Sequence, residues 1–194
     1  AISSEIVLDK LMTELLKIVL ENAGANRGFL LLKKGTQFFI EVEAYSDKKA
    51  IKLTEAIALE ESKYLSQAII NYVIRTKENL VLDDASKDDR FAQDPYIVTT
   101  QPKSILSIPI INQGNLTGIL YLENNLATGV FTVERLEVLH MLSTQAAISI
   151  DNANLYADLN KALEHEKVTK KVQAELLAVQ KELAYARQLQ LSML

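Results

Sequence analysis

The C-terminal part of the chain carries a helix signal that no residue interrupts. From Thr132 to Leu194 the sequence contains neither glycine nor proline, the residues that most often end a helix. Glu134 and Glu137 lie near its start, where the positive end of a helix dipole favours acidic side chains. A helix of this length exceeds what one globular domain needs. We therefore expect it to run on from its domain towards another one.

Apolar residues on this helix form a stripe that one helix cannot bury alone. Near the chain end they recur at steps of three and four, the a/d pattern of a coiled coil. A second stripe lies upstream, and the letters EHEK separate the two. The stripes do not keep one register, which predicts a stutter near Glu164 to Lys167. We predict a parallel homodimer through Leu155, Leu159, Val172, Leu176, Val179, Leu183, Ala186 and Met193.

The residues before Thr132 predict a sheet with helices packed on it. Apolar residues recur at helical spacing from Ser4 to Asn22 and from Tyr64 to Arg75. Alternating or continuous apolar runs bounded by turns predict strands at 28–34, 38–46, 79–85, 104–111 and 116–124. Residues 47–63 are charged and weakly patterned, and we assign them no element. Because hairpins join the strands and helices flank them, we predict an α+β fold with an antiparallel sheet.

Side-chain alternation sorts the last hairpin into two faces. The face that we expect against the terminal helices is apolar: Leu106, Ile108, Ile110, Leu116, Gly118, Leu120 and Leu122. The opposite face is half polar: Ile105, Ser107, Pro109, Thr117, Ile119, Tyr121 and Glu123.

A half-polar sheet face under the long irregular stretch 86–103 is typical of a small-ligand pocket. We predict that Phe91, Tyr96, Ser107 and Tyr121 line this pocket and surround a flat ligand. The alternative is that Phe91 and Tyr96 only fill the space under the loop, as buried aromatic residues usually do.

Composition excludes several classes of function. The chain has 21 basic and 25 acidic residues, a net charge of -4 and no basic cluster, so it is poorly suited to nucleic acid. Because cysteine is absent, disulfides, thiolate metal sites and thioether-linked cofactors are excluded. No apolar run approaches the ~20 residues of a membrane span, and the first residues do not form a signal peptide. We expect no membrane partner and a cytoplasmic setting.

No group of residues predicts an enzyme active site. His140 and His165 have no clustered ligands, so we predict no metal site. Asp83, Asp84, Asp88 and Asp89 are interpreted as turn and capping residues rather than as a site for a cation or an amine. The glycines do not form a phosphate loop, and no serine has a histidine partner at a suggestive spacing. This chain is therefore expected to be a regulatory fragment without catalytic residues.

Two long stretches resemble the GAF domain, in the subtype found in multidomain bacterial and especially cyanobacterial signalling proteins. They are INYVIRTKENLVLDDASKDDRFAQDPYI and PKSILSIPIINQGNLTGILYLENNLATGVFTVERLEVLHMLSTQAAISIDNANLY, and the resemblance covers Ile2 to Tyr156. Within ENNLATGVFTVER, Asn124 or Asn125, Phe131 and Glu134 correspond to a family motif, but the lysine that pairs with the acid is missing.

The resemblance implies a six-stranded antiparallel sheet between helical layers, a ligand pocket on one face and dimerisation through the terminal helices. Family ligands include cyclic nucleotides, bilins, haem and small metabolites. A covalent bilin is excluded because cysteine is absent. We therefore expect no covalent cofactor and a non-covalent small ligand, such as a cyclic nucleotide.

The final letters KELAYARQLQLSML resemble the lead-in helix of bacterial metal-dependent Ser/Thr phosphatases of the stress-response type. Since the chain begins at Ala1 without methionine, we interpret it as a fragment with a sensory GAF domain at 1–156 and a coiled-coil signalling helix at 157–194. The helix would pass a signal to an output domain in cis, a phosphatase or alternatively a histidine kinase of two-component signalling. A second alternative is a structural dimeriser without a ligand.

Overall fold

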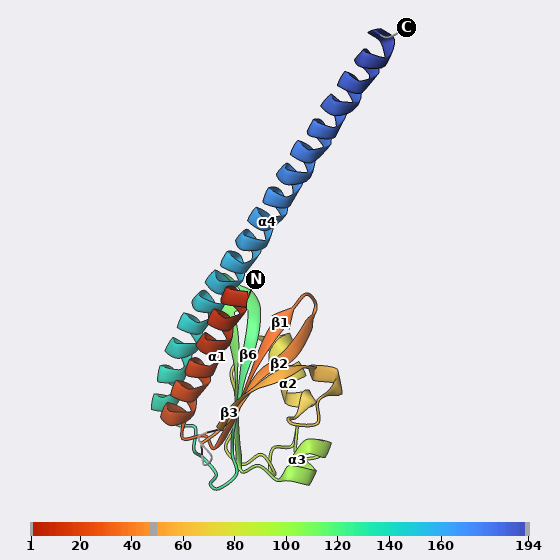
Figure 1. Ribbon diagram of the computed structural model, residues 1–194. Helices are drawn as coiled ribbons and strands as arrows, with labels where there is room; N and C mark the ends of the chain where they lie inside the picture. The colour runs from red at the N-terminus through yellow and green to blue at the C-terminus, as the bar shows by residue number, and fades with distance from the viewer. Residues whose placement is uncertain (1, 47–49, 193–194) are drawn as a thin grey trace.

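The chain forms an antiparallel sheet between two helical layers, and one long helix projects from it (Figure 1). The computed structural model describes the backbone of residues 2–46 and 50–192, and the side chains of residues 8–46 and 56–188. In chain order the elements are α1 (Ile2–Ala23), β1 (Arg27–Lys34), β2 (Gln37–Tyr45), β3 (Ala50–Ala58), the 3-10 turn η1 (Leu59–Glu61), α2 (Gln67–Thr76), β4 (Leu80–Leu82), α3 (Pro95–Thr100), β5 (Ser104–Asn112), β6 (Asn115–Asn124) and α4 (Val133–Ser192).

The sheet has six strands in the order β3-β2-β1-β6-β5-β4, and every neighbouring pair is antiparallel. The predicted α+β class and the six-stranded sheet between helical layers are therefore confirmed. Strands β1 and β6 lie at the centre, although most of the chain separates them in sequence. Their pairing brings the beginning of β1 next to the end of β6, with Arg27 opposite Glu123.

Strand β3 is an element that the sequence pattern did not reveal. It occupies Ala50–Ala58, within the segment to which no element was assigned. Ile51, Leu53 and Ile57 do alternate, but Lys52 and Glu55 lie among them. As an edge strand, β3 is hydrogen-bonded only to β2, and edge strands commonly carry charges that discourage further pairing. The signal of an edge strand is therefore weaker than that of a central one.

Each face of the sheet is covered by its own pair of helices. In Figure 1, α1 and α4 lie on one side of the sheet and α2 and α3 on the other. Leu30, Leu106 and Leu120 belong to the core beneath α1 and α4. Phe29, Ile105 and Tyr121 belong to the core beneath α2 and α3. Both faces being apolar explains why the central strands are almost continuously buried.

One residue of the predicted apolar face lies on the other side. Leu106, Ile108, Ile110, Leu120 and Leu122 pack towards α1 and α4 as predicted, but Leu116 joins the core beneath α2. The cause is a β-bulge, because Ile110 pairs with Gly118 whereas Ile111 pairs with Leu116. A bulge adds one residue to one strand and reverses the alternation beyond it.

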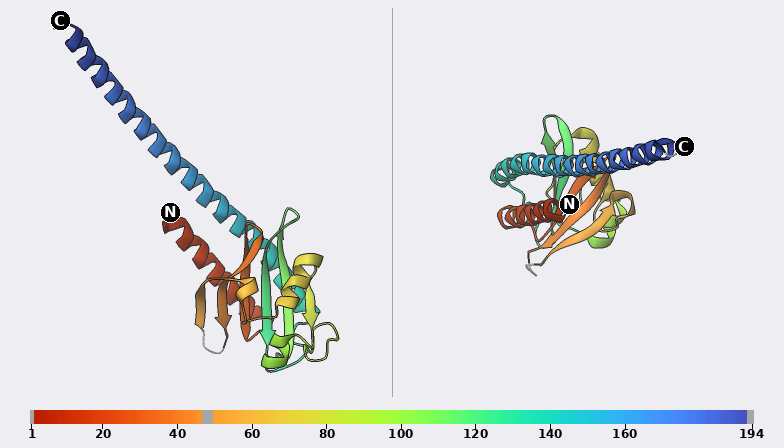
Figure 2. Two further views of the ribbon diagram at one scale, coloured as in Figure 1. Left: turned by 90° about the vertical axis from the view of Figure 1, so that its right-hand side faces the viewer. Right: turned by 45° about the horizontal axis from the view of Figure 1, so that its top comes forward.

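The long helix α4 is part of the domain core in its first half only. It begins after Thr132, whose carbonyl oxygen accepts a hydrogen bond from the Leu136 amide at 3.0 Å. Leu139, Ala147 and Ile150 are buried against the sheet and α1. From Asn154 onward the described side chains are exposed, except for the half-buried Ala157. Figure 2 shows this part of α4 extending well past the sheet.

The predicted dimer residues lie on this projecting part. Leu155 is 67% exposed, Leu176 58% and Leu183 65%. Leu159, Val172 and Val179 are also exposed, and so is Ala186. Met193 lies outside the described residues. Exposed leucine and valine side chains at this spacing need a partner, and the homodimer remains our prediction. Among the described residues, no helix combines the length and the apolar character needed to cross a membrane.

Candidate functional site

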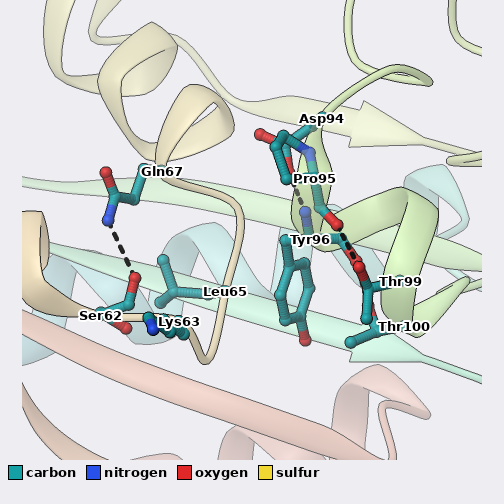
Figure 3. Close-up of a pocket in the computed structure, with 9 residues that line it drawn as sticks. All are labelled: Ser62, Lys63, Leu65, Gln67, Asp94, Pro95, Tyr96, Thr99 and Thr100. Carbon is teal, nitrogen blue, oxygen red and sulfur yellow. Dashed lines mark hydrogen bonds between the residues drawn. The ribbon is translucent and has the colours of Figure 1, made fainter.

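A cavity with a volume of about 540 Å³ lies between the N-terminal end of α2, the segment before it and α3. Figure 3 shows the side chains around it, with the ring of Tyr96 forming a wall. The lining residues are Ser62, Lys63, Leu65, Gln67, Asp94, Pro95, Tyr96, Thr99 and Thr100. Its walls thus combine an aromatic ring with polar side chains, as ligand sites commonly do.

The N-cap residues of α2 and α3 are hydrogen-bonded to each other beside the cavity. Ser66 caps α2 by accepting a hydrogen bond from the Ile69 amide at 3.2 Å, and Asp94 caps α3 by accepting one from the Tyr96 amide at 2.9 Å. The Ser66 hydroxyl also donates to Asp94 Oδ2 at 2.9 Å. This bond joins the starts of α2 and α3, and so fixes the position of Tyr96.

Behind Tyr96 lies a buried polar network. The Tyr96 hydroxyl donates to Glu123 Oε2 at 3.0 Å and accepts from Arg27 Nη1 at 3.0 Å. The Tyr121 hydroxyl donates to the other oxygen, Glu123 Oε1, at 3.0 Å. Tyr96 therefore lies between the cavity and a carboxylate that is only 1% exposed.

Arg27 connects this network to a second carboxylate. Its Nε and Nη2 donate to Glu43 Oε1 at 3.0 and 2.6 Å, and the Tyr45 hydroxyl donates to the same oxygen at 2.6 Å. The guanidinium lies 4.5 Å from the Phe29 ring centroid, in cation–π geometry. Arg27 Nη1 is 3.9 Å from Glu123 Oε2. The single positive charge of Arg27 thus lies near two carboxylates, Glu43 and Glu123. When both are ionised, the three side chains carry a net charge of one negative unit.

The burial of the network shifts its proton equilibria. Burial raises the pKa of Glu123, although the two phenol hydrogen bonds and the Arg27 charge oppose this effect. Burial and the nearby Glu123 charge also raise the pKa of Tyr96 and of Tyr121, so both phenols keep their protons. Burial thus favours the protonated form of the Glu123 carboxyl and of both phenols.

The structure brings two of the four predicted pocket residues together. Tyr96 lines the cavity. The hydroxyls of Tyr96 and Tyr121 both donate to the Glu123 carboxylate. Ser107 pairs with Tyr121 across β5 and β6, and its buried hydroxyl has no hydrogen-bond partner among the described residues. Phe91 is buried against Tyr72, in an edge-to-face contact with centroids 5.7 Å apart, and is not among the residues that line the cavity.

Arg27 and Glu43 were not among the predicted site residues. Arg27 begins β1 directly before an apolar run, and Glu43 is one of two glutamates that alternate with apolar residues in β2. Their proximity follows from the hairpin register, in which Arg27 pairs with Tyr45 and Phe29 with Glu43. Glu123 was placed on the half-polar face, but its connection to Arg27 depends on the pairing of β1 with β6. Charge positions alone do not reveal that pairing.

The residue after Glu123 ties the end of β6 to α1. The Asn124 side-chain amide donates to the Gly24 carbonyl at 2.8 Å, and its oxygen accepts from the Leu126 and Ala127 amides, both at 2.8 Å. Arg135, in the first turn of α4, donates to the carbonyls of Ala23 and Val130 at 3.1 and 2.9 Å. The end of β6, the end of α1 and the start of α4 therefore form one bonded junction.

The acidic residues of the loop act locally. Asp84 accepts from Ser86 and pairs with Lys87 at 2.8 Å, and Asp88 pairs with Arg90 at 2.8 Å. These bonds match the predicted turn-forming role. Among the described residues, no group of three or more His, Cys, Asp or Glu side chains is placed to hold a metal ion.

Comparison with known proteins identifies a family. The family model described as GAF domain matches residues 7–150. The hybrid signal transduction histidine kinase G of Dictyostelium discoideum is 50% identical over 94 residues, which are 48% of this chain and 3% of that protein. The peroxide stress-activated histidine kinase mak3 of Schizosaccharomyces pombe is 26% identical over 177 residues, which are 91% of this chain and 8% of that protein.

The chain is also similar to a phosphodiesterase and to a solved GAF-domain structure. The probable 3',5'-cyclic phosphodiesterase pde-5 of Caenorhabditis elegans is 25% identical over 176 residues, which are 89% of this chain and 24% of that protein. The PixJ GAF-domain of Thermosynechococcus elongatus, in its blue-light absorbing form, has a TM-score of 0.65 at 9% identity and covers 85% of this chain and 97% of that one. That likeness shows the fold alone. This chain spans only a small part of the length of its curated relatives.

The raised pKa of Glu123 predicts a pH-dependent gain in stability for Glu123→Gln. In the unfolded chain the carboxyl has its ordinary pKa of 4.5, whereas in the folded chain the pKa is higher. Between these two values the folded state binds more protons, so the free energy of unfolding of the parent falls as the pH rises through this window. Glutamine does not titrate. The variant should therefore gain stability relative to the parent over the same window.

Urea unfolding of both proteins at a series of pH values measures this difference. Glu60→Gln, at an exposed carboxylate, is the matched control. A difference between Glu123→Gln and the parent that stays constant with pH would contradict the assigned pKa shift.

Proposed function

This chain belongs to the GAF domain family, and we propose that it is the sensory and regulatory module of a larger signalling protein. The observation that carries the proposal is the continuous bonding from the cavity wall to the start of α4. Tyr96 bonds to Glu123, the next residue Asn124 bonds to Gly24, and Arg135 of α4 bonds to Ala23 beside it. A change at the cavity thus has a short structural route to the projecting helix.

The proposed signal is a small non-covalent ligand in the cavity. A ligand that moves the Tyr96 ring would remove a donor from Glu123 and an acceptor from Arg27 at once. Arg27 and Glu123, already 3.9 Å apart, could then pair directly. Two such arrangements of one network form the kind of two-state element that a relay needs.

The proposed assembly is a parallel homodimer through the projecting part of α4. The exposed apolar residues of this part continue the stripe that begins on the domain with Met141 and Ile148, which are 73% and 41% exposed. Burying a large apolar side chain stabilises an interface by about 1.5–3 kcal/mol at most. A parallel arrangement delivers two output domains at the same end, where each can respond to the other. The two-part division at residue 156 remains a proposal, since α4 runs through it unbroken.

We propose a histidine kinase as the output domain in cis. The histidine kinases of D. discoideum and S. pombe among the relatives support this choice. The Ser/Thr phosphatase output rests only on the last letters of the chain, and none of the relatives named above carries that description. The alternative of a structural dimeriser without a ligand predicts the same helix pairing but an inert cavity.

The cavity should bind a small molecule, and Tyr96→Phe should strengthen that binding. The substitution keeps the ring and removes the hydroxyl that bridges Arg27 and Glu123. Thermal unfolding with cyclic AMP, cyclic GMP and other small metabolites should reveal a compound that raises the melting temperature. Because the parent must break these two hydrogen bonds when the ring moves and the variant has none to break, the variant should bind the compound about tenfold more tightly.

Thr144→Val on the opposite side of the sheet is the control, and it should leave that affinity unchanged. If no compound stabilises the parent and native mass spectrometry detects no bound molecule, the structural dimeriser is the better account.

Cysteine substitution tests the parallel dimer on this cysteine-free background. In a parallel, in-register coiled coil the two copies of residue 183 face each other. Leu183→Cys should therefore form a disulfide with its own copy under mild oxidation, seen as a doubled mass on a non-reducing gel. Lys181→Cys, which lies off the stripe, is the matched control and should cross-link poorly. Efficient cross-links only between positions 183 and 172 in a mixed sample would indicate antiparallel helices.

A further inference from the structure

One helical serine lacks a hydrogen bond that all of its described counterparts make. Hydroxyls of serine and threonine inside helices commonly donate to the carbonyl four residues earlier. In the described helices this bond is made by Thr13, Thr76, Thr99, Thr100, Thr144, Ser149 and Thr169. Ser143 of α4 is 4% exposed, and its hydroxyl has no partner among the described residues. A buried unpaired hydroxyl calls for a specific explanation.

Ser143 lines a second cavity, on a different part of the domain from the first, and its hydroxyl oxygen is buried at the wall of this cavity. This cavity has a volume of about 280 Å³ and lies between α4, strand β5 and the connection from α2 to β4. Pro109 and Ile111 supply its apolar side. Pro109 lies beyond the last β4 pairing, which joins Leu80 to Ser107, so β4 does not cover this edge of β5. The space greatly exceeds the roughly 30 Å³ that one water molecule occupies.

Hydrogen-bond donors gather on the other sides of this cavity. Lys77, Asn79 and His140 line it together with Ser143. Lys77 ends α2 in the left-handed conformation, with φ of 56°. Its ammonium contacts the Gly114 carbonyl at 3.3 Å, which leaves further N–H donors available. The acidic residue on the lining is Glu78, and its side chain is exposed, as are those of Lys77, Asn79 and His140.

We propose that this second cavity binds a small aliphatic carboxylate. The carboxylate would accept hydrogen bonds from the Lys77 ammonium and, once the Ser143 side chain rotates towards the cavity, from the Ser143 hydroxyl. The aliphatic part would pack on Pro109 and Ile111. Such a ligand satisfies the buried hydroxyl and matches both the donor-rich and the apolar side. A cationic ligand would face Lys77 without a buried acceptor. Because His140 and Ser143 belong to α4, occupancy would act on the relay helix directly, independently of the Tyr96 cavity.

Matched ligands of opposite charge test the proposal. The isotope-labelled chain is titrated with sodium butyrate, and separately with butylammonium chloride, at constant ionic strength and neutral pH. Backbone amide signals are followed by NMR. Butyrate should give saturable shifts in residues 77–79 and 140–144, whereas butylammonium should not.

Substitutions separate this site from non-specific binding. Ser143→Ala should weaken butyrate about tenfold, because a hydrogen bond to a charged group is lost. Lys77→Asn should do the same, since asparagine tolerates the left-handed conformation while the charge is removed. Ser149→Ala is the matched control: its hydroxyl already donates to the Gln145 carbonyl and Ser149 does not line the cavity, so butyrate affinity should stay within about twofold.

Glu78→Gln should strengthen butyrate binding by about two- to threefold, as expected for the loss of an exposed like charge. The proposal is overturned if butyrate gives no saturable shifts at these residues. It is equally overturned if butylammonium binds as well as butyrate, or if Ser143→Ala binds butyrate as the parent does.

Discussion

The packing of α4 on the sheet is the interaction on which the rest of the structure depends. Leu139, Ala147 and Ile150 of this helix join a core that also contains Met12 and Leu16 of α1 and the inner residues of the central strands. The alanines let the helix approach the sheet closely. Since the same helix continues without a break to Ser192, any displacement of its buried half must also move its exposed half. A rigid helix shared by the core and the tail is the mechanical basis of the proposed relay.

The buried polar network beside the cavity is the element whose change we expect to displace α4. Hydrogen bonds and charges act strongly in a low-dielectric interior, and a group left unpaired there is costly. In the observed arrangement Glu123 accepts hydrogen bonds from Tyr96 and Tyr121 and lies 3.9 Å from Arg27. Asn124, the next residue in the chain, and Arg135 of α4 both bond to the end of α1. A change in the charge or hydrogen-bond partners of Glu123 therefore acts next to the junction of β6, α1 and α4.

Local patterning predicts much of this fold, and its failures have physical causes. The long helix, both hairpins and the apolar face towards α1 and α4 follow from hydrophobic periodicity, while the number of six strands came from family resemblance. The opposite face was predicted to be half polar, but Ile105, Ile119 and Tyr121 on it belong to a second apolar core. Leu116 was assigned to the wrong face because a bulge reverses the alternation, and β3 was missed because an edge strand tolerates charge. For the candidate site, the predicted Tyr96 lines the cavity and the predicted Tyr121 bonds to the same carboxylate, Glu123, whereas Arg27 and Glu43 were not predicted. Their contact arises only when β1 pairs with both β2 and β6.

The most direct measurement compares the geometry of the paired tails when only Glu123 is changed. A spin label on Glu175→Cys, an exposed tail position, reports the distance between the two protomers by double electron–electron resonance. The account predicts that Glu123→Gln shifts this distance distribution relative to the otherwise unchanged protein, whereas Glu60→Gln leaves it in place. Superimposable distributions for all three proteins, or no dipolar coupling between labels, would contradict a relay from the Glu123 network to the tail.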